Sequence, residues 1–280
     1  MPRLTKIDER YNSEQVQLAL DSMLIAVAMK KPNTKDLAEI ASLLDSGADP
    51  NAIGGDALQH LGAKGNAEGI ELLLSRGARV EESNYKSLFW AAYMGRTAAL
   101  ARLLDVIASA PRKHGAMTDF LAYHLELLTG ACEGGHDDTV RHLLARGASA
   151  EKAASAAIDA AGRGHAAVVD SLLRAGMPVD VDDNALLMSA TFRGAADVVV
   201  VVLRHGGTLG PLGVWTNRKL GYNSNYTARE VAHLRGHVDI VATIDAAVAM
   251  RNLRDGSRHE ARCDVMSTPR ASVSTAAGRL

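Results

Sequence analysis

The stretch that decides the fold is AGRGHAAVVDSLLRAG, residues 161–176. Its first half contains Gly162-x-Gly164-x-x-Ala167, which is similar to the glycine loop that holds the pyrophosphate of a dinucleotide cofactor. Its second half places apolar residues at helical spacing before a closing glycine, Gly176. The choice between a cofactor loop and a repeated helical unit depends on whether the pattern occurs elsewhere in the chain.

The pattern recurs along most of the sequence. A leading glycine is followed by an aliphatic residue five positions later and by apolar residues at positions eight and nine. Most steps between copies are 29 or 30 residues, and two are about ten residues longer. Seven copies in one register predict a repeat protein. The leading residues are Lys35, Gly65, Gly95, Gly135, Gly164, Gly194 and Gly236.

Each copy predicts two helices joined by a tight turn. Apolar residues at offsets of three and four, such as Ile70, Leu73 and Leu74, lie on one face of a helix. A glycine just past a helix end adopts the left-handed conformation at low cost, which explains both the leading and the closing glycines. The helix before each leading glycine carries small residues, such as Ala160-Ala161, which allow close packing. A few aliphatic side chains cannot offset the ordering entropy of one unit, so the units must stack into an elongated solenoid.

Several segments resemble ankyrin repeats. They include GADPNAIGGDALQHLGAKGN (47–66), GGHDDTVRHLLARGAS (134–149) and NYTAREVAHLRGHVDIV (225–241), and the resemblance covers roughly residues 33–250. It implies a helical solenoid that binds proteins through a concave face of loops and first helices. Ankyrin repeats run to about 33 residues, with β-hairpin fingers between them. The shorter units here predict an all-α, ankyrin-like solenoid of about seven repeats with reduced β-hairpin fingers, formed as loops or single turns.

The repeat also decides the role of Gly162 and Gly164. A dinucleotide loop needs a β-strand before the glycines, but the preceding EKAASAAIDA (151–160) is predicted to be helical. The two glycines are therefore expected to end one helix and begin the turn to the next. We predict no cofactor.

The repeat and its ends divide the chain. We expect an N-terminal lead-in over 1–11, a solenoid over 12–250 and a disordered tail over 251–280, which has no periodic apolar face. Asp245 takes an apolar position of the last unit, as expected for a C-terminal cap. The two long steps contain insertions at about 105–123 and 207–226. The units are expected near 12–48, 49–78, 79–110, 120–148, 149–177, 178–207 and 225–250.

The second insertion gathers aromatic and basic residues in a chain with only 4% aromatic residues. Trp, Tyr and Arg commonly anchor protein interfaces, and long loops on rigid scaffolds often carry function. The alternative is a longer loop whose rings fold back onto the last repeat. Other candidates are chosen by their position in the loops. The predicted partner-binding residues are Asn51, Ile53, Glu81, Tyr85, Asp182, Asp183, Trp215, Arg218, Lys219, Tyr222 and Tyr226.

No motif in the sequence predicts catalysis or a metal site. There is no Cys-x-x-Cys, His-Glu-x-x-His, Gly-x-Ser-x-Gly or Walker sequence. His136, His165 and His237 each follow a leading glycine, and a position that recurs with the repeat predicts a structural role, such as hydrogen bonds to nearby loop backbone. Cys132 takes a small-residue position, where we expect a packed and inert thiol.

The composition limits the classes of partner and the compartment that we expect. With 31 basic and 32 acidic residues, the formal net charge of -1 gives no electrostatic reason to expect nucleic acid or an anionic membrane. Two distant cysteines fit a reducing compartment, and the start, MPRLTKIDER, has no apolar core typical of a signal peptide. We expect a cytoplasmic monomer.

The predicted function is a non-catalytic protein–protein interaction scaffold. Two alternatives keep the same fold: a dedicated inhibitor or immunity protein of one enzyme or toxin, and a microbial effector that acts on host proteins. An enzyme is a third class, which would require a deep cleft that joins titratable side chains from separate repeats.

Overall fold

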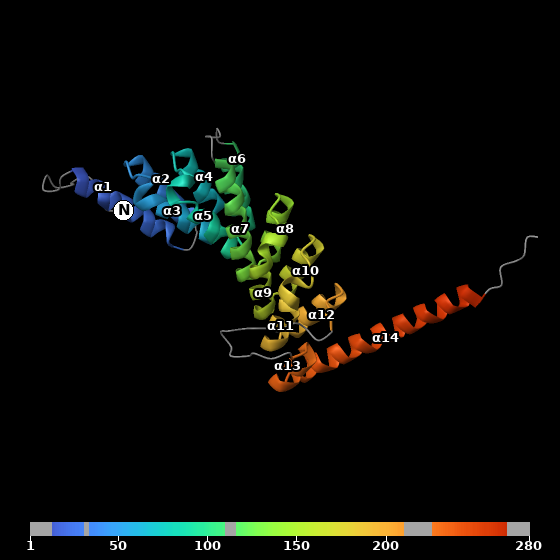
Figure 1. Cartoon of the computed structure of the whole chain (residues 1–280). Helices are drawn as coiled ribbons and strands as arrows, with labels where there is room; N and C mark the ends of the chain where they lie inside the picture. The colour runs from blue at the N-terminus through green and yellow to red at the C-terminus, as the bar shows by residue number, and fades with distance from the viewer. Residues whose placement is uncertain (1–12, 31–33, 110–115, 210–225, 268–280) are drawn as a thin grey trace, which may run out of the picture.

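The computed structural model describes residues 13–30, 34–109, 116–209 and 226–267. These residues form fourteen α-helices and two short 3-10 helices, and no β-strand occurs among them. The helices lie side by side along a curved row (Figure 1). The prediction of an all-α solenoid with reduced fingers is therefore confirmed.

The helices form seven pairs that follow the order of the predicted units; the fourth pair begins before its unit, at Ala116, and the last pair continues beyond its unit, to Ser267. Two 3-10 helices, η1 (Val80–Ser83) and η2 (Glu151–Ala153), precede the third and fifth pairs. The pairs are α1 (Ser13–Ala28) with α2 (Thr34–Asp45), α3 (Ala52–Lys64) with α4 (Ala67–Ser75), α5 (Lys86–Tyr93) with α6 (Thr97–Ser109), α7 (Ala116–Gly134) with α8 (Asp137–Ala145), α9 (Ala154–Arg163) with α10 (Ala166–Arg174), α11 (Val181–Arg193) with α12 (Ala196–Arg204), and α13 (Ala228–Arg235) with α14 (Val238–Ser267).

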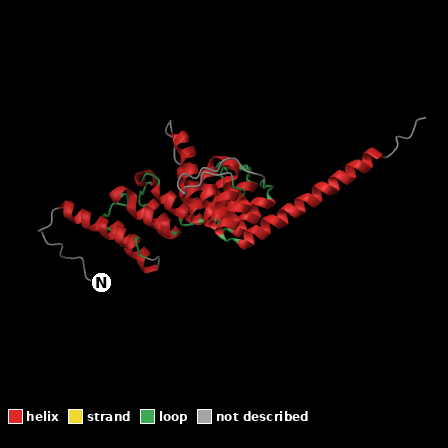
Figure 2. Cartoon of the chain, turned by 60° about the horizontal axis from the view of Figure 1, so that its bottom comes forward, coloured by secondary structure: helices red, strands yellow, loops and turns green. Residues whose placement is uncertain are grey.

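The pairs stack in two layers. Each first helix packs against the first helix of the next pair, from α1 and α3 to α11 and α13, and each second helix does the same from α2 to α14. Green loops connect the red helices of the two layers in Figure 2. Every internal unit therefore has a neighbour on both sides, as a unit that cannot fold alone requires.

The predicted helix faces form the core. Ile70, Leu103 and Leu172 on the second helices are fully buried, at 0% exposure. On the first helices the small residues Ala160 and Cys132 are equally buried, which allows neighbouring helices to lie close together.

Gly164 ends α9 in the left-handed conformation, with a φ of +85°. Its N–H donates to the Ala161 carbonyl at 3.2 Å, and the N–H of His165 donates to the Ala160 carbonyl at 2.9 Å. The residues before the glycine belong to η2 and α9, so no strand leads into it. The resemblance to a dinucleotide loop is thus excluded by the local structure.

The first insertion is largely helical. α6 continues to Ser109 and α7 begins at Ala116, before the predicted unit start at 120, while 110–115 lie outside the described residues. Much of the insertion therefore lengthens two helices. Of the second insertion, the structure describes 207–209 and Tyr226, and the remaining residues lie outside the described part of the chain.

The predicted tail requires a correction. α14 runs on to Ser267, so residues 251–267 are helical and not disordered. This segment lacks a periodic apolar face, but four of its residues are arginines, which favour helices, and the next proline is Pro269. Residues 268–280 lie outside the described part of the chain.

The last pair combines a polar cap position with exposed apolar side chains. Asp245 is exposed and pairs with Arg229, whose Nε lies 2.6 Å from Oδ1, as suits a polar cap position. The pair also exposes Val238 and Leu253, at 77% and 72%.

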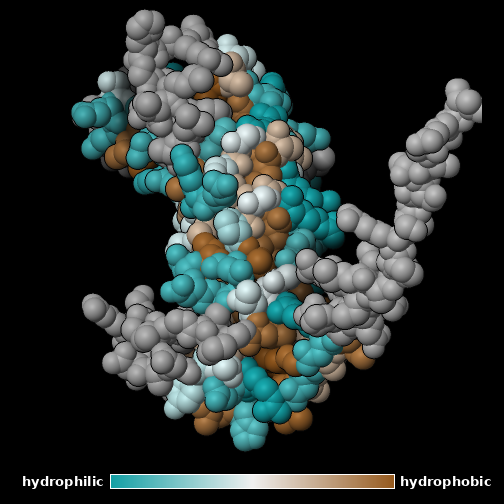
Figure 3. All heavy atoms as spheres, turned by 45° about the vertical axis from the view of Figure 1, so that its right-hand side comes forward, coloured by the Kyte–Doolittle hydropathy of each residue, from teal (hydrophilic) through white to brown (hydrophobic). Residues whose placement is uncertain are grey.

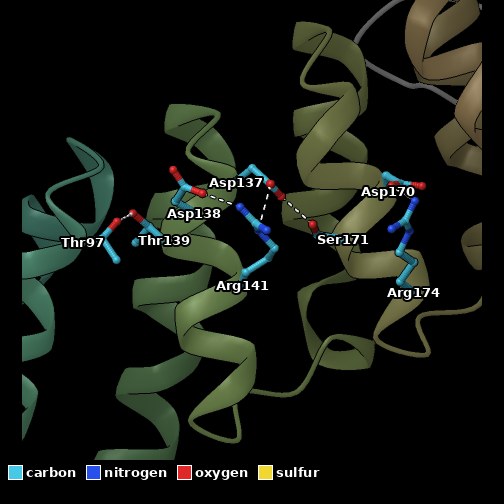
Figure 4. A network of polar contacts seen from close by, with 8 residues as sticks. All are labelled: Thr97, Asp137, Asp138, Thr139, Arg141, Asp170, Ser171 and Arg174. Atoms are coloured by element: carbon cyan, nitrogen blue, oxygen red, sulfur yellow. Dashed lines mark hydrogen bonds and ion pairs between the residues drawn. The ribbon is translucent and has the colours of Figure 1, made fainter.

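Polar contacts join the second helices of neighbouring pairs (Figure 4). Ser171 of α10 donates to Asp137 of α8 at 2.5 Å, while Arg141 lies beside the same carboxylate at 3.1 Å. The ion pair of the exposed Arg141 lies within α8 and adds little stability. We interpret the part-buried contacts between helices as ones that fix the register between repeats. The contacts between successive second helices include Thr97–Thr139, Asp137–Ser171 and Asp170–His205.

Candidate functional site

The loops that lead into the first helices adopt a backbone conformation that side chains rarely take. Ile53, Tyr85, Asp182 and Asp183 have φ angles of +51°, +59°, +46° and +55°. For a β-branched residue such as Ile53 this conformation is a genuine outlier, and it persists only where neighbouring structure holds it. Four predicted contact residues therefore lie in constrained turns at the N-terminal ends of first helices.

Side-chain hydrogen bonds hold some of these loops to the neighbouring repeat. The Asn51 amide donates to the Gly77 carbonyl at 3.0 Å and accepts from the Arg79 N–H at 2.8 Å. Asn51 thus joins two loops, and its role as a partner contact stays a prediction. The same spacing of 28 residues recurs between Asp21 and Asp49, Asn51 and Arg79, and Asp180 and Thr208.

The structure brings one group of predicted contacts together. The turn after Ile53 lies against η1, because a Cβ on Gly55 would lie only 3.3 Å from the backbone nitrogen of Ser83. Since η1 contains Glu81 and is followed by Tyr85, these two candidates lie near Ile53. Asp182 and Asp183 open α11, which three further first helices separate from α3 (Figure 1). The candidates therefore line one edge of the row and do not converge on one point.

The remaining candidates come from the second insertion. Tyr226 is 37% exposed and directly precedes Thr227, which begins α13 with reciprocal hydrogen bonds to Glu230. The candidates outside the described residues are Trp215, Arg218, Lys219 and Tyr222.

An aromatic cluster on α5 was missed by the sequence analysis. Phe89 and Tyr93 are stacked with ring centroids 6.1 Å apart, and Trp90 meets both rings edge-on at 5.6 and 5.8 Å. All three side chains are half-buried, as is Tyr85 before them. Because residues 85, 89 and 93 are spaced by four, the sequence did carry the signal of one aromatic helix face.

Glycines of α7 make room for this cluster. A Cβ on Gly130 would lie 3.2 Å from the Phe89 ring, and one on Gly134 would lie 2.3 Å from the Tyr93 carbonyl oxygen. α5 and α7 therefore approach closely along the aromatic side. Figure 3 shows that apolar residues reach the surface of the row in a broken band between hydrophilic ones.

The histidines after the leading glycines pack against the preceding repeat. A Cβ on Gly95 would lie 2.4 Å from Nδ1 of His136, so the imidazole rests on this glycine. His165 rests on Gly135 in the same way. Neither ring caps its own helix by a hydrogen bond, so the structural role arises from packing rather than from the expected bonds to loop backbone. His237 makes the equivalent contact with Gly194.

Among the described residues, no three or more His, Cys, Asp or Glu side chains gather as they would around a metal ion. In that same part of the chain, no helix combines the length and apolar character needed to cross a membrane.

Cys132 is expected to resist thiol reagents in the folded protein. It is completely buried, and burial raises the pKa of its thiol to about 12, with a smaller contribution from Glu133. The other cysteine of the chain is Cys263, so in a Cys263→Ser variant Cys132 is the remaining thiol. Because the thiolate is the reactive form, this variant should show almost no labelling by a thiol-specific chromogenic reagent near neutral pH until denaturant is added. Rapid labelling of the native variant would contradict this placement.

The fold resembles that of ankyrin-repeat proteins of known structure. The crystal structure of the human ASB11 ankyrin repeat domain matches with a TM-score of 0.58, over 81% of this chain and 96% of that chain, at 17% sequence identity. No protein-family model matches the sequence, and no curated protein sequence is significantly similar to it. The chain thus has an ankyrin-repeat-like fold.

Proposed function

We propose that this protein is a non-catalytic scaffold that binds a protein partner along its first helices and the loops before them. The observation that carries the proposal is that side chains such as Asn51 hold loops of neighbouring repeats together. A surface that is already ordered loses little conformational entropy when it binds, which favours recognition of another folded or extended chain.

Further features agree with a binding role. The exposed Ile53 and the half-buried rings of α5 are residue types that anchor interfaces when a partner covers them. The described polar contacts between helices, such as that of Asp137 with Ser171, join repeats to one another. The buried thiol of Cys132 fits a reducing compartment, so the proposal places the protein in the cytoplasm.

Affinity capture from the native source tests this function. A triple variant, Ile53→Ser with Asp182→Ser and Asp183→Ser, should recover the partner at roughly one tenth of the wild-type level, because contacts at the centre of an interface dominate affinity. The matched control is Val200→Ala, which changes an exposed side chain on the second-helix layer. A variant with 207–226 shortened to a standard turn tests the second insertion in the same way.

The outcomes separate the possible roles. Equal recovery by wild type, the triple variant and the shortened variant would exclude the proposed binding edge. One stoichiometric partner whose enzymatic or toxic activity is blocked in the complex would define a dedicated inhibitor or immunity protein. A host protein as the partner would define an effector.

A further inference from the structure

We propose that the protein forms a symmetric dimer through an apolar face of its last pair of helices, with α14 antiparallel to α14 of a second copy. The inference goes beyond the proposed function, because it concerns contact between two copies of the chain and needs no other protein. Such a dimer differs from the monomer expected from the sequence. We call this surface the end face, and its exposed residues are Leu234 of α13 and Val238, Ala242, Ala246, Ala249 and Leu253 of α14.

The end face lies on the side of α14 that points away from the core. At 3.6 residues per turn, its five residues on α14 fall within about 80° of the helix circumference. The buried side chains Ile240 and Ile244 lie on the opposite side of the helix. A surface helix normally carries polar residues opposite its buried face, whereas α14 is apolar on both sides.

The end face continues the interface that joins units along the row. Two residues after a leading glycine, Asp137 of α8 accepts a hydrogen bond from Ser171 of α10 at 2.5 Å. Six residues after a leading glycine, Asp170 of α10 contacts the residue that caps α12. α14 has Val238 and Ala242 at these two positions. Apolar residues therefore stand in the last unit where carboxylates of internal units reach the unit that follows.

The first helix of the last pair extends this face. A Cβ on Gly162, two residues before the leading glycine of its unit, would lie 2.7 Å from Oγ of Ser189 on the next first helix. Leu234 takes the same position before Gly236 and is 63% exposed. The face thus has the position and the two-helix width of an interface between units, so a second pair of helices is the occupant that fits it.

The residues of α14 on this face make it complementary to itself. Val238 and Leu253 stand at the two ends, with three alanines between them. When two copies lie antiparallel, Val238 of each meets Leu253 of the other and Ala242 meets Ala249, while Ala246 lies near the two-fold axis. A symmetric dimer requires such a self-complementary patch. The small side chains at the centre allow the two helices to approach closely.

The length of α14 suits this pairing. Residues 238–253 span about 24 Å at 1.5 Å per residue. α14 also extends past the other second helices, so a second copy can lie along it beyond the row (Figure 1). Because two-fold symmetry uses every contact twice, the large side chains Leu234, Val238 and Leu253 of both copies would leave water together.

The charge beside the end face does not oppose the pairing. Asp245 lies next to the centre of the face, where two copies bring their carboxylates towards each other. In each copy the guanidinium of Arg229 holds this carboxylate, with N–O distances of 2.6 and 3.0 Å. Each Asp245 therefore reaches the two-fold axis as part of a neutral pair, which limits repulsion between like charges.

Light scattering coupled to size-exclusion chromatography of the full chain tests the inference. At micromolar concentration the mass should be twice that of the 29.6 kDa chain. The double variant Val238→Glu with Leu253→Glu should raise the dissociation constant roughly a hundredfold, because each copy would bury two unpaired charges. Both side chains are exposed within one chain, so the variant should fold normally, and circular dichroism with the thermal midpoint checks this.

The matched control is Val200→Glu, which places the same charge on the exposed surface of α12 and should leave the dimer intact. Sodium chloride gives a second control. Screening weakens contacts between exposed charges and leaves apolar burial in place, so the wild-type dimer should persist at about 0.5 M salt.

Engineered cysteines test the antiparallel register in a Cys263→Ser background. Ala246→Cys should form a disulfide between copies on mild oxidation, because this position lies near the two-fold axis. Ala242→Cys alone should not, since its two copies would be separated by about 10 Å along the helix axes alone, beyond the reach of a disulfide. An equimolar mixture of Ala242→Cys and Ala249→Cys should cross-link.

Each contrary result is decisive. A monomeric mass up to about 100 µM, far above the micromolar range expected here, would overturn the inference. So would a dimer that survives Val238→Glu with Leu253→Glu, or one that cross-links through Ala242→Cys alone. A mass that keeps rising with concentration would indicate head-to-tail stacking, which a symmetric pair excludes. None of these results bears on the loop edge, so the proposed function stands or falls separately.

Discussion

Replacing Gly134 by alanine should lower the free energy of unfolding by about 3 kcal/mol, because overpacking against rigid backbone is costly. The added Cβ would lie 2.3 Å from the Tyr93 carbonyl oxygen and 2.6 Å from Cδ2 of His136. The carbonyl belongs to α5, so the clash can be relieved only by moving two repeats apart. Urea denaturation followed by circular dichroism measures the change.

Gly77→Ala is the matched control. Gly77 closes a second helix with a φ of +89°, and nothing lies within 4 Å of an added Cβ. Its replacement should cost about 1 kcal/mol, the penalty for an alanine in the left-handed region. If Gly134→Ala were no more destabilising than Gly77→Ala, the close contact between α5 and α7 would be wrong.

Truncating Leu172 to alanine should cost about 3 kcal/mol, as expected for a cavity at a completely buried leucine. Leu172 lies on α10, which packs against α8, α9 and α12. Because each unit depends on its neighbours, we expect faster amide hydrogen exchange in all four helices, and not in α10 alone.

The comparison variant for Leu172 is Val200→Ala. Val200 lies on the equivalent helix of the next unit but is 39% exposed. Its truncation should change stability by less than about 1 kcal/mol. Exchange that increases only within α9 and α10 in the Leu172→Ala variant would show that the repeats fold independently, contrary to the stacked arrangement.

Most of the fold follows from local patterns in the sequence. The spacing of Gly164, Val169 and Leu172 specifies a turn and a helix face, and its repetition specifies the stack. The helical continuation over 251–267 was not predicted, because this segment lacks the periodic apolar face on which the sequence analysis relied. Helix propensity without burial is a weaker signal than periodicity.

The candidate site was less predictable. Loop position suggested Ile53 and Tyr85 as candidates but did not indicate their left-handed conformation. The turn after Ile53 lies against Ser83 of the next repeat, a contact that the sequence pattern does not show. Phe89 was missed because half-burial of an aromatic side chain at the edge of the stack depends on tertiary packing, here on the room left by Gly130 of another helix. The repeat pattern identifies the core face of a helix and says little about the opposite face.

Amide hydrogen exchange of the full chain, with and without the partner recovered by affinity capture, tests the central claim most directly. The claim is that the first helices and their loops form the binding surface. It predicts slower exchange on binding in η1, α5 and α7, with the second helices α4, α6 and α8 unchanged. Protection confined to α4, α6 and α8, with none in the first-helix layer, would contradict it.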